Sequence, residues 1–226
     1  LPVTGWLSNR MTVSGTLSNP ELSGTVHVWD GSILGELFEN GTAQYRMKDG
    51  IFYLDNSVGY IYKGAVHATG YISTDSVDVA LSVSDMDLGR LFRDRDFGGS
   101  LSAEGRVTGT LQSPSFDGGF YCREITLAGS RITDALGRVS YSNRVIHIDH
   151  GRFRQGNGEF IWNGNLDTDT NAISGELNFS HWNIPSVAAF LRFPIHDVTG
   201  EISGSTALGG TNDPPDACAK FQVETG

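Results

Sequence analysis

The sequence predicts an antiparallel, all-β protein that is built from a repeated unit of about 95 residues and carries one apolar face. The first observation is composition: 29 of the 226 residues are Gly. Average usage of about 7% would give roughly 16, and such an excess is typical of many strands joined by tight turns. The second is a hydrophobic content of only 38%, which suits a thin sheet with one solvated face. The third is a set of internal repeats, which decide the fold before any local pattern does.

The clearest repeat is a short Gly-Thr-Leu motif that contains a Pro. Residues 15–24 (GTLSNPELSG) recur as residues 109–118 (GTLQSPSFDG), and a shorter third copy lies at residues 209–214 (GGTNDP). The repeat is too long for one rung of a solenoid, so each unit must hold several hairpins. We expect repeat units at residues 11–104 and 105–199 and a partial unit at residues 200–226.

The segments between these motifs keep the same offset. Residues 47–55 (MKDGIFYLD) match residues 141–149 (YSNRVIHID). Residues 77–83 match residues 173–179 after a two-residue insertion. The same offset superimposes single glycines, pairing Gly64 with Gly158 and Gly70 with Gly164.

Within each unit the hydrophobic period is two, as in a strand with one buried face. Residues 77–84 (VDVALSVS) place four apolar side chains on one side, and residues 173–180 (ISGELNFS) repeat the arrangement. Strand and turn together are expected to take about ten residues, the spacing of an all-β meander. Four dipeptides predict the turns between strands: Asp30-Gly31, Asn40-Gly41, Asp49-Gly50 and Asn163-Gly164.

In each repeat unit the sequence also predicts one short helix after the last strand. Residues 87–93 (DLGRLFR) combine a capping Asp with apolar residues at helical spacing. Residues 183–191 (NIPSVAAFL) begin with Asn and have Pro185 in the first turn, where proline is tolerated. Two such helices are too short to bury the sheet, so we expect them to plug or flank it.

Charge and cysteine content narrow the functional classes. The formal net charge is −10 and the sequence pI is about 4.9, which argues against nucleic-acid binding because that needs a basic face. Cys122 and Cys218 lie one repeat apart, too far across a meander for a disulfide. The chain has no signal peptide and no membrane-spanning run. Both ends fall within strand-like patterns, so we expect it to be part of a longer protein with targeting signals elsewhere.

No motif predicts an enzyme, a cofactor or a metal site. The densest group of candidate ligands, residues 147–150 (HIDH), would place His147 and Asp149 on one side of a strand and His150 on the other. No Gly-x-Ser-x-Gly elbow is present. The many Asp and Asn residues fall where turns need them for backbone reasons.

The repeated motif and the short helices resemble the TamB and AsmA-like family. The resemblance is carried by residues 15–24, 109–118, 87–92 and 183–191, and in pattern it covers nearly the whole chain. It implies a long, strongly curved, U-shaped antiparallel sheet (a β-taco) with an apolar concave face. The third copy departs from the motif at residues 212–215 (NDPP), which leaves the register of the last strand open.

The same resemblance implies a function. Proteins of this family are bridge-like lipid transfer proteins that span the bacterial periplasm from an inner-membrane anchor and carry phospholipid to the outer membrane. TamB, part of a translocation and assembly module, is also tied to an outer-membrane barrel partner of the Omp85 type and to outer-membrane biogenesis. We therefore expect phospholipid acyl chains as the ligand, with no cofactor, no nucleic acid and no membrane span within this chain.

A sheet with one apolar face must cover that face with another layer or with a ligand. Acyl chains would do so at about 0.8 kcal/mol per buried methylene. Aromatic residues such as Trp29 and Trp182 fit either a grip on acyl chains or a packed core. We expect the lipid-binding concave face to comprise Val26, Val28, Val77, Val79, Leu81, Val83, Ile146, Ile148, Phe160, Trp162, Ile173, Leu177 and Phe179.

Two other functions fit the same pattern. In a structural repeat scaffold or adhesin, the sheet would close over a dry, filled core and display its loops. In a chaperone-like module, an exposed terminal strand would template strands of outer-membrane proteins by β-augmentation. What separates them from lipid binding is the amount of apolar face that no layer covers.

Overall fold

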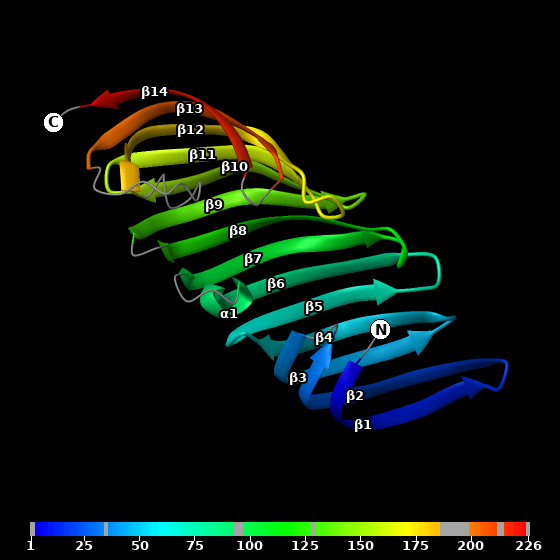
Figure 1. The fold of residues 1–226 in the computed structure, drawn as a ribbon. Coiled ribbons are helices and arrows are strands. Elements are labelled where there is room, and N and C mark those ends of the chain that lie inside the picture. The colour runs from blue at the N-terminus through cyan, green and yellow to red at the C-terminus, as the bar shows by residue number, and fades with distance from the viewer. Residues whose placement is uncertain are drawn as a thin grey trace. The chain divides into compact units, whose positions relative to one another are not determined.

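The fold is all-β and antiparallel, as the alternating pattern predicts. It is a sheet of 14 strands that is not closed into a barrel (Figure 1). The computed structural model describes residues 3–33, 36–92, 97–127, 130–185, 199–211 and 215–224. Each strand pairs with the strands that precede and follow it in the chain. The chain forms two compact units: unit 1 is Leu1–Asp87 with Ser102–Phe116, and unit 2 is Leu88–Leu101 with Asp117–Gly226.

The strands run in chain order from the N-terminus to the C-terminus. They are β1 (Val3–Thr16), β2 (Asn19–Ile33), β3 (Glu36–Lys48), β4 (Ile51–Ile61), β5 (Gly64–Ile72), β6 (Val77–Asp87), β7 (Phe97–Gly109), β8 (Pro114–Leu127), β9 (Ser130–Ser142), β10 (Val145–Gln155), β11 (Gly158–Asp167), β12 (Ile173–Asn183), β13 (Glu201–Gly210) and β14 (Pro215–Glu224).

The repeated Gly-Pro motif forms the hairpin that follows β1, β7 and β13, so one repeat is six strands. In the first copy Gly15 lies directly opposite Pro20, and in the third Gly210 lies opposite Pro215. Matching Gly209 to the motif was therefore wrong by one residue. The reason is backbone conformation, since the motif glycine at the end of each strand, or one residue before it, has a left-handed φ: 86° at Gly15, 104° at Gly109 and 81° at Gly210.

The strands are longer than the predicted spacing, from 9 residues in β5 to 15 in β2. Of the four predicted turns, only Asp49-Gly50 forms a turn; the other three dipeptides lie inside β2, β3 and β11. Two of these glycines are needed for close approach between strands. A Cβ on Gly31 would collide with the carbonyl oxygen of Thr4, and one on Gly164 would lie 2.7 Å from that of Ser174.

Several strands contain one residue with a left-handed backbone away from any turn. Such a residue interrupts the alternation of side chains and bends the strand, as a β-bulge does. Glycines of the neighbouring strand make room for it: a Cβ on Gly64 would lie 2.6 Å from the Cα of Met86, and one on Gly158 would collide with the carbonyl of His181. Apart from glycines, the left-handed residues within strands are Asp30, Asp85, Asp134, His150 and His181, with φ between 48° and 55°.

The first predicted helix is present as α1 (Leu88–Phe92), directly after β6. The Asp87 carboxylate lies 2.9 Å from the ammonium group of Lys63. Of the second predicted helix, Ile184 and Pro185 are helical, and residues 186–191 lie outside the described part of the chain. Among the described helices, none has the length and apolar content needed to cross a membrane.

Candidate functional site

Unit 1 has one face that is almost entirely apolar. Residues directly opposite each other in an antiparallel sheet point to the same side, so the register defines the face. Val28 lies opposite Leu7 and Gly41, and Val66 opposite Val83. All six residues predicted from this part of the sequence share this face. The apolar face of unit 1 comprises Leu7, Met11, Val13, Leu22, Val26, Val28, Ala43, Tyr45, Met47, Phe52, Leu54, Val66, Ala68, Ile72, Val77, Val79, Leu81 and Val83.

Exposure of this face is highest on β1. Val77 and Val79 on β6 are buried at 7% exposure. On β1, Leu7 is 65%, Met11 49% and Val13 60% exposed. Exposed large apolar side chains on one continuous face are typical of a binding surface. The uncovered part of the face therefore lies on β1.

The opposite face of unit 1 is polar and carries ion pairs between neighbouring strands. The Arg46 guanidinium donates two 2.6 Å hydrogen bonds to the Asp55 carboxylate and lies 5.2 Å from the ring centre of Tyr53. The hydrogen bond from Arg46 lowers the pKa of Asp55. Lys48 lies 2.8 Å from Glu21. The two faces thus differ in chemistry, and only one offers a surface to an apolar ligand.

A polar contact within the apolar face was not predicted. The Asn9 amide nitrogen donates a hydrogen bond to the Tyr45 hydroxyl at 2.9 Å, from β1 to β3. The Tyr45 side chain crosses β2 at Gly24, where a Cβ would lie 3.0 Å from its oxygen. Its ring stacks on that of Phe52 at 5.4 Å. The alternation of apolar residues through residues 41–47 (GTAQYRM) is the signal that would have placed Tyr45 on this face.

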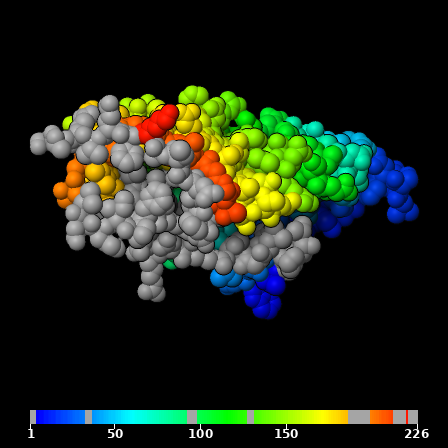
Figure 2. Space-filling model, turned by 45° about the horizontal axis from the view of Figure 1, so that its top comes forward, coloured from blue at the N-terminus to red at the C-terminus, as the bar shows by residue number. Residues whose placement is uncertain are grey.

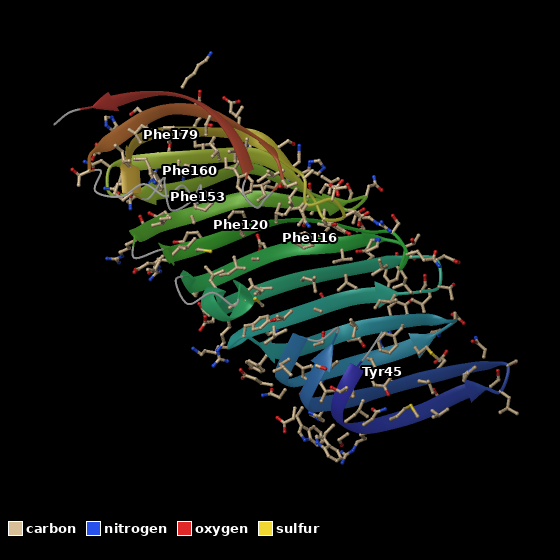
Figure 3. All side chains as sticks on the ribbon, viewed as in Figure 1. Tyr45, Phe116, Phe120, Phe153, Phe160 and Phe179 are labelled. Atoms are coloured by element: carbon tan, nitrogen blue, oxygen red, sulfur yellow. The ribbon has the colours of Figure 1, made fainter. Side chains whose placement is uncertain are left out.

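Unit 2 also has one apolar face, and the register again brings the predicted residues together. Phe160 lies opposite Phe153 on one side and Phe179 on the other (Figure 3). Trp162 lies opposite Leu177. All seven residues predicted from this part of the sequence are therefore on one face. The apolar face of unit 2 comprises Ile146, Ile148, Phe153, Phe160, Trp162, Leu166, Ile173, Leu177, Phe179, Trp182, Ile202 and Leu208.

Unlike the face in unit 1, this face is filled by side chains of the unit itself. Leu177 is completely buried, Phe160 is 3% exposed and Phe179 6%. The rings of Phe160 and Trp182 lie 5.4 Å apart. The segments of β10 to β13 lie next to one another in the space-filling view (Figure 2). The core also contains residues that the sequence analysis did not identify, namely Leu88 of α1, Cys122, Ile125, Ile132 and Ala135.

The histidines of unit 2 do not form a ligand cluster, and among the described residues no group of His, Cys, Asp or Glu could hold a metal ion. The prediction that Asp149 and His150 face opposite ways was wrong, because their side chains lie 2.6 Å apart. The left-handed backbone of His150, at φ 51°, interrupts the alternation. His147 keeps its strand geometry and hydrogen-bonds to Asn165 across the ladder.

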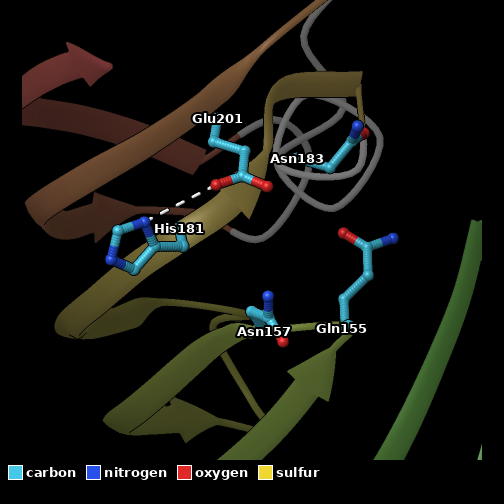
Figure 4. A pocket seen from close by; sticks show the side chains of 6 residues that line it. Gln155, Asn157, His181, Asn183 and Glu201 are labelled. Atoms are coloured by element: carbon cyan, nitrogen blue, oxygen red, sulfur yellow. Dashed lines mark ion pairs between the residues drawn. The ribbon is translucent and has the colours of Figure 1, made fainter. Parts of the chain in front are cut away.

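A polar cavity of about 550 Å³ lies at one end of unit 2 (Figure 4). It is formed where the β10–β11 turn meets the ends of β12 and β13. The His181 imidazole lies 3.5 Å from the Glu201 carboxylate at this site. The remaining lining residues are Gly156 and three residues with amide side chains, Gln155, Asn157 and Asn183, so this cavity gives no reason to assign a reaction.

The strongest candidate for a binding site is therefore the exposed part of the apolar face of unit 1. Trp29, considered above as a grip on acyl chains, lies on the other face, because its chain neighbour Val28 belongs to the apolar one. No known protein family, curated protein or solved structure matches the chain.

Proposed function

We propose that the chain is a hydrophobic-groove segment that binds phospholipid acyl chains and passes them along its apolar face. The observation that carries the proposal is the contrast within unit 1: one face is apolar and exposed at Leu7, Met11 and Val13, while the other is polar and ion-paired. A ligand with long apolar chains covers such a face, at about 0.8 kcal/mol for each buried methylene.

The proposal assigns binding to unit 1. In unit 2 an acyl chain would have to displace Leu177, Phe160 and other side chains that already fill the apolar face. Removing those contacts costs the free energy that their packing contributes. The exposed part of the face in unit 1 needs no such displacement, so it is where acyl chains bind.

The wider role rests on the resemblance to the TamB and AsmA-like family. On that basis we propose that the chain belongs to a periplasmic protein anchored in the inner membrane, which conducts phospholipid towards the outer membrane. The same resemblance proposes an outer-membrane barrel of the Omp85 type as its partner and a part in outer-membrane assembly. The acidic net charge of −10 fits lipid recognition through acyl chains and disfavours attraction to anionic headgroups.

Site-specific photo-crosslinking tests the proposal. A benzophenone side chain at Met11, on the exposed part of the apolar face, is expected to crosslink to co-purified phospholipid, which mass spectrometry of the adduct would identify. The matched control is Thr12, the following residue, which is exposed on the opposite face of the same strand. Equal crosslinking from both positions would contradict the proposal. So would the absence of crosslinks from either position if the natively purified protein also contains no lipid.

A structural scaffold is the second candidate function, and the filled core of unit 2 favours it for that unit. Leu177, Phe160 and Trp182 form the kind of dry interior that a scaffold requires. Under this alternative the native protein carries no lipid, and substitutions that place a charged residue on the exposed apolar face of unit 1 leave the biological activity of the protein unchanged. The crosslinking experiment, together with a check for lipid in the native protein, therefore separates the two functions.

A further inference from the structure

Unit 1 carries a row of exposed aromatic residues on its polar face, opposite the apolar one. Trp6 lies directly across from Trp29, Trp29 from Asn40, and Asn40 from Tyr60. Trp6 is 68%, Trp29 38% and Tyr60 40% exposed. These four residues, from β1 to β4, are called the aromatic row, and they run across the strands, not along them.

A polar row runs beside the aromatic row on the same face. Ser8 lies opposite His27, and His27 lies opposite Thr42. The His27 ring nitrogen Nδ1 and the Thr42 hydroxyl oxygen lie 2.9 Å apart in a hydrogen bond. The aromatic rings are thus bordered by hydroxyl and imidazole groups, and the Asn40 amide within the row can both donate and accept hydrogen bonds.

Sheet stability alone does not explain this row. A cross-strand aromatic pair stabilises a sheet when the two residues are direct neighbours, which accounts for Trp6 and Trp29. Tyr60 is separated from Trp29 by Asn40, so it gains nothing from such a pair. Three exposed aromatic residues in line across neighbouring strands therefore mark a binding surface.

We propose that the aromatic row binds a neutral, extended, β-linked glycan chain that lies across the strands. Strands in a sheet are about 4.8 Å apart, which is similar to the length of one pyranose ring in such a chain. Successive sugars would then meet Trp6, Trp29, Asn40 and Tyr60 in turn. The C–H face of a pyranose packs on an aromatic ring, while its hydroxyl groups hydrogen-bond to the Asn40 amide and the Thr42 hydroxyl.

The chemistry of the surface selects this class of ligand. Neither row contains Lys or Arg, and the chain has a net charge of −10, so an acidic polysaccharide would be repelled. A protein partner would require a broad patch that becomes fully desolvated, whereas the aromatic row is narrow and has hydroxyl and imidazole groups along one side. Because the row lies on the face opposite the lipid site, this inference does not depend on the proposed function.

Titration with neutral hexasaccharides tests the inference. Cellohexaose and chitohexaose are the probes, and calorimetry and tryptophan fluorescence are the measurements. Trp29→Ala and Tyr60→Ala are each expected to weaken binding about fivefold, the contribution of one aromatic contact. The matched control is Tyr121→Ala, which removes an aromatic residue that is 42% exposed in β8 and outside the row.

Two further variants distinguish a loss of glycan binding from a loss of folding. Trp29→Tyr keeps an aromatic ring and is expected to retain most of the binding, while Leu81→Ala on the apolar face is expected to leave it unchanged. The inference is overturned if neither hexasaccharide binds at millimolar concentration, or if Tyr121→Ala weakens binding as much as Trp29→Ala. Preferential binding of an acidic hexasaccharide, or a self-association that Trp29→Ala abolishes in the absence of glycan binding, would overturn it as well.

Discussion

At the scale of single residues, Cys122 is the clearest case of an environment that changes chemistry. Its side chain is 3% exposed in the core of unit 2, and burial raises the pKa of its thiol to about 11. A thiolate is the reactive form of cysteine. The native protein therefore keeps this thiol protonated and shielded, as expected for a residue that serves packing.

The pKa of Cys122 makes a prediction about stability. The thiol titrates near 8.5 when unfolded and near 11 when folded, so between these values the folded state binds more protons than the unfolded state. The free energy of unfolding should therefore decrease as the pH rises from about 8.5 towards 11. Urea unfolding at several pH values would measure it, with Cys122→Ala as the control that lacks this contribution. Equal pH dependence in the two proteins would contradict the assignment.

At the scale of elements, the glycines that recur between repeats have a structural purpose that their positions alone do not reveal. The sequence matched Gly70 with Gly164, and in the structure both lie where a neighbouring strand comes close. A Cβ on Gly70 would lie 2.7 Å from the Cα of Val79, and one on Gly164 would lie 2.7 Å from the carbonyl oxygen of Ser174. The repeat thus preserves contact distances between strands.

This close approach predicts that Gly70→Ala weakens the pairing of β5 with β6. Gly70 also has a left-handed φ of 145°, so the substitution combines backbone strain with a collision and should cost on the order of 1 to 3 kcal/mol. Gly59→Ala on the adjacent strand β4 is the matched control, because the nearest atom to its Cβ would be 3.9 Å away. Thermal unfolding of the two variants would show whether only Gly70→Ala lowers the melting temperature.

Leu81 and Leu177 occupy equivalent positions in β6 and β12, yet their surroundings differ. Leu177 is completely buried, whereas Leu81 is only partly buried. Leu177→Ala should therefore destabilise the protein by about 3 to 4 kcal/mol, and Leu81→Ala by clearly less, because a partly exposed side chain leaves no closed cavity. Chemical unfolding followed by circular dichroism measures both. Similar losses would mean that the apolar face of unit 1 is covered in solution.

The sequence predicted the class of fold and which apolar residues share a face of the sheet. It did not predict the local details of the backbone. Strict alternation placed Leu81, Leu177 and every other predicted residue on a common face within its unit. Bulges could not be predicted, because Asp and His are ordinary strand or turn residues and only the folded backbone shows that Asp30 or His181 is left-handed. For the same reason Asp30-Gly31 read as a turn, although it lies within β2. The difference in burial between the units depends on packing that no local pattern encodes.

At the scale of the molecule, the two units differ in how completely they bury their apolar faces. The face of unit 2 is closed by its own side chains and by α1, while that of unit 1 is exposed along β1. Stability within a protein follows such differences, since regions with few buried apolar contacts open more readily. The open unit is the one assigned to ligand binding, and the closed unit the one that can supply rigidity.

Hydrogen exchange would reveal this difference directly. Backbone amides in β10, β11 and β12 are expected to exchange more slowly than those in β1 and β2, because their strands are held on a buried face. Added phospholipid should slow exchange in unit 1 and leave unit 2 nearly unchanged. Uniform protection across both units would show instead that the chain opens as a single cooperative body.

The order of the strands has a consequence for how the protein is made. Each strand pairs with the one that precedes it in the chain, so every step of assembly closes only a short loop and has a low entropic cost. Low contact order of this kind favours rapid folding. A chain that emerges from its N-terminal end can add one strand at a time to a growing edge, without waiting for any distant segment. Synthesis and folding can then proceed in the same direction and in step, which shortens the time for which an apolar strand is left without a neighbour.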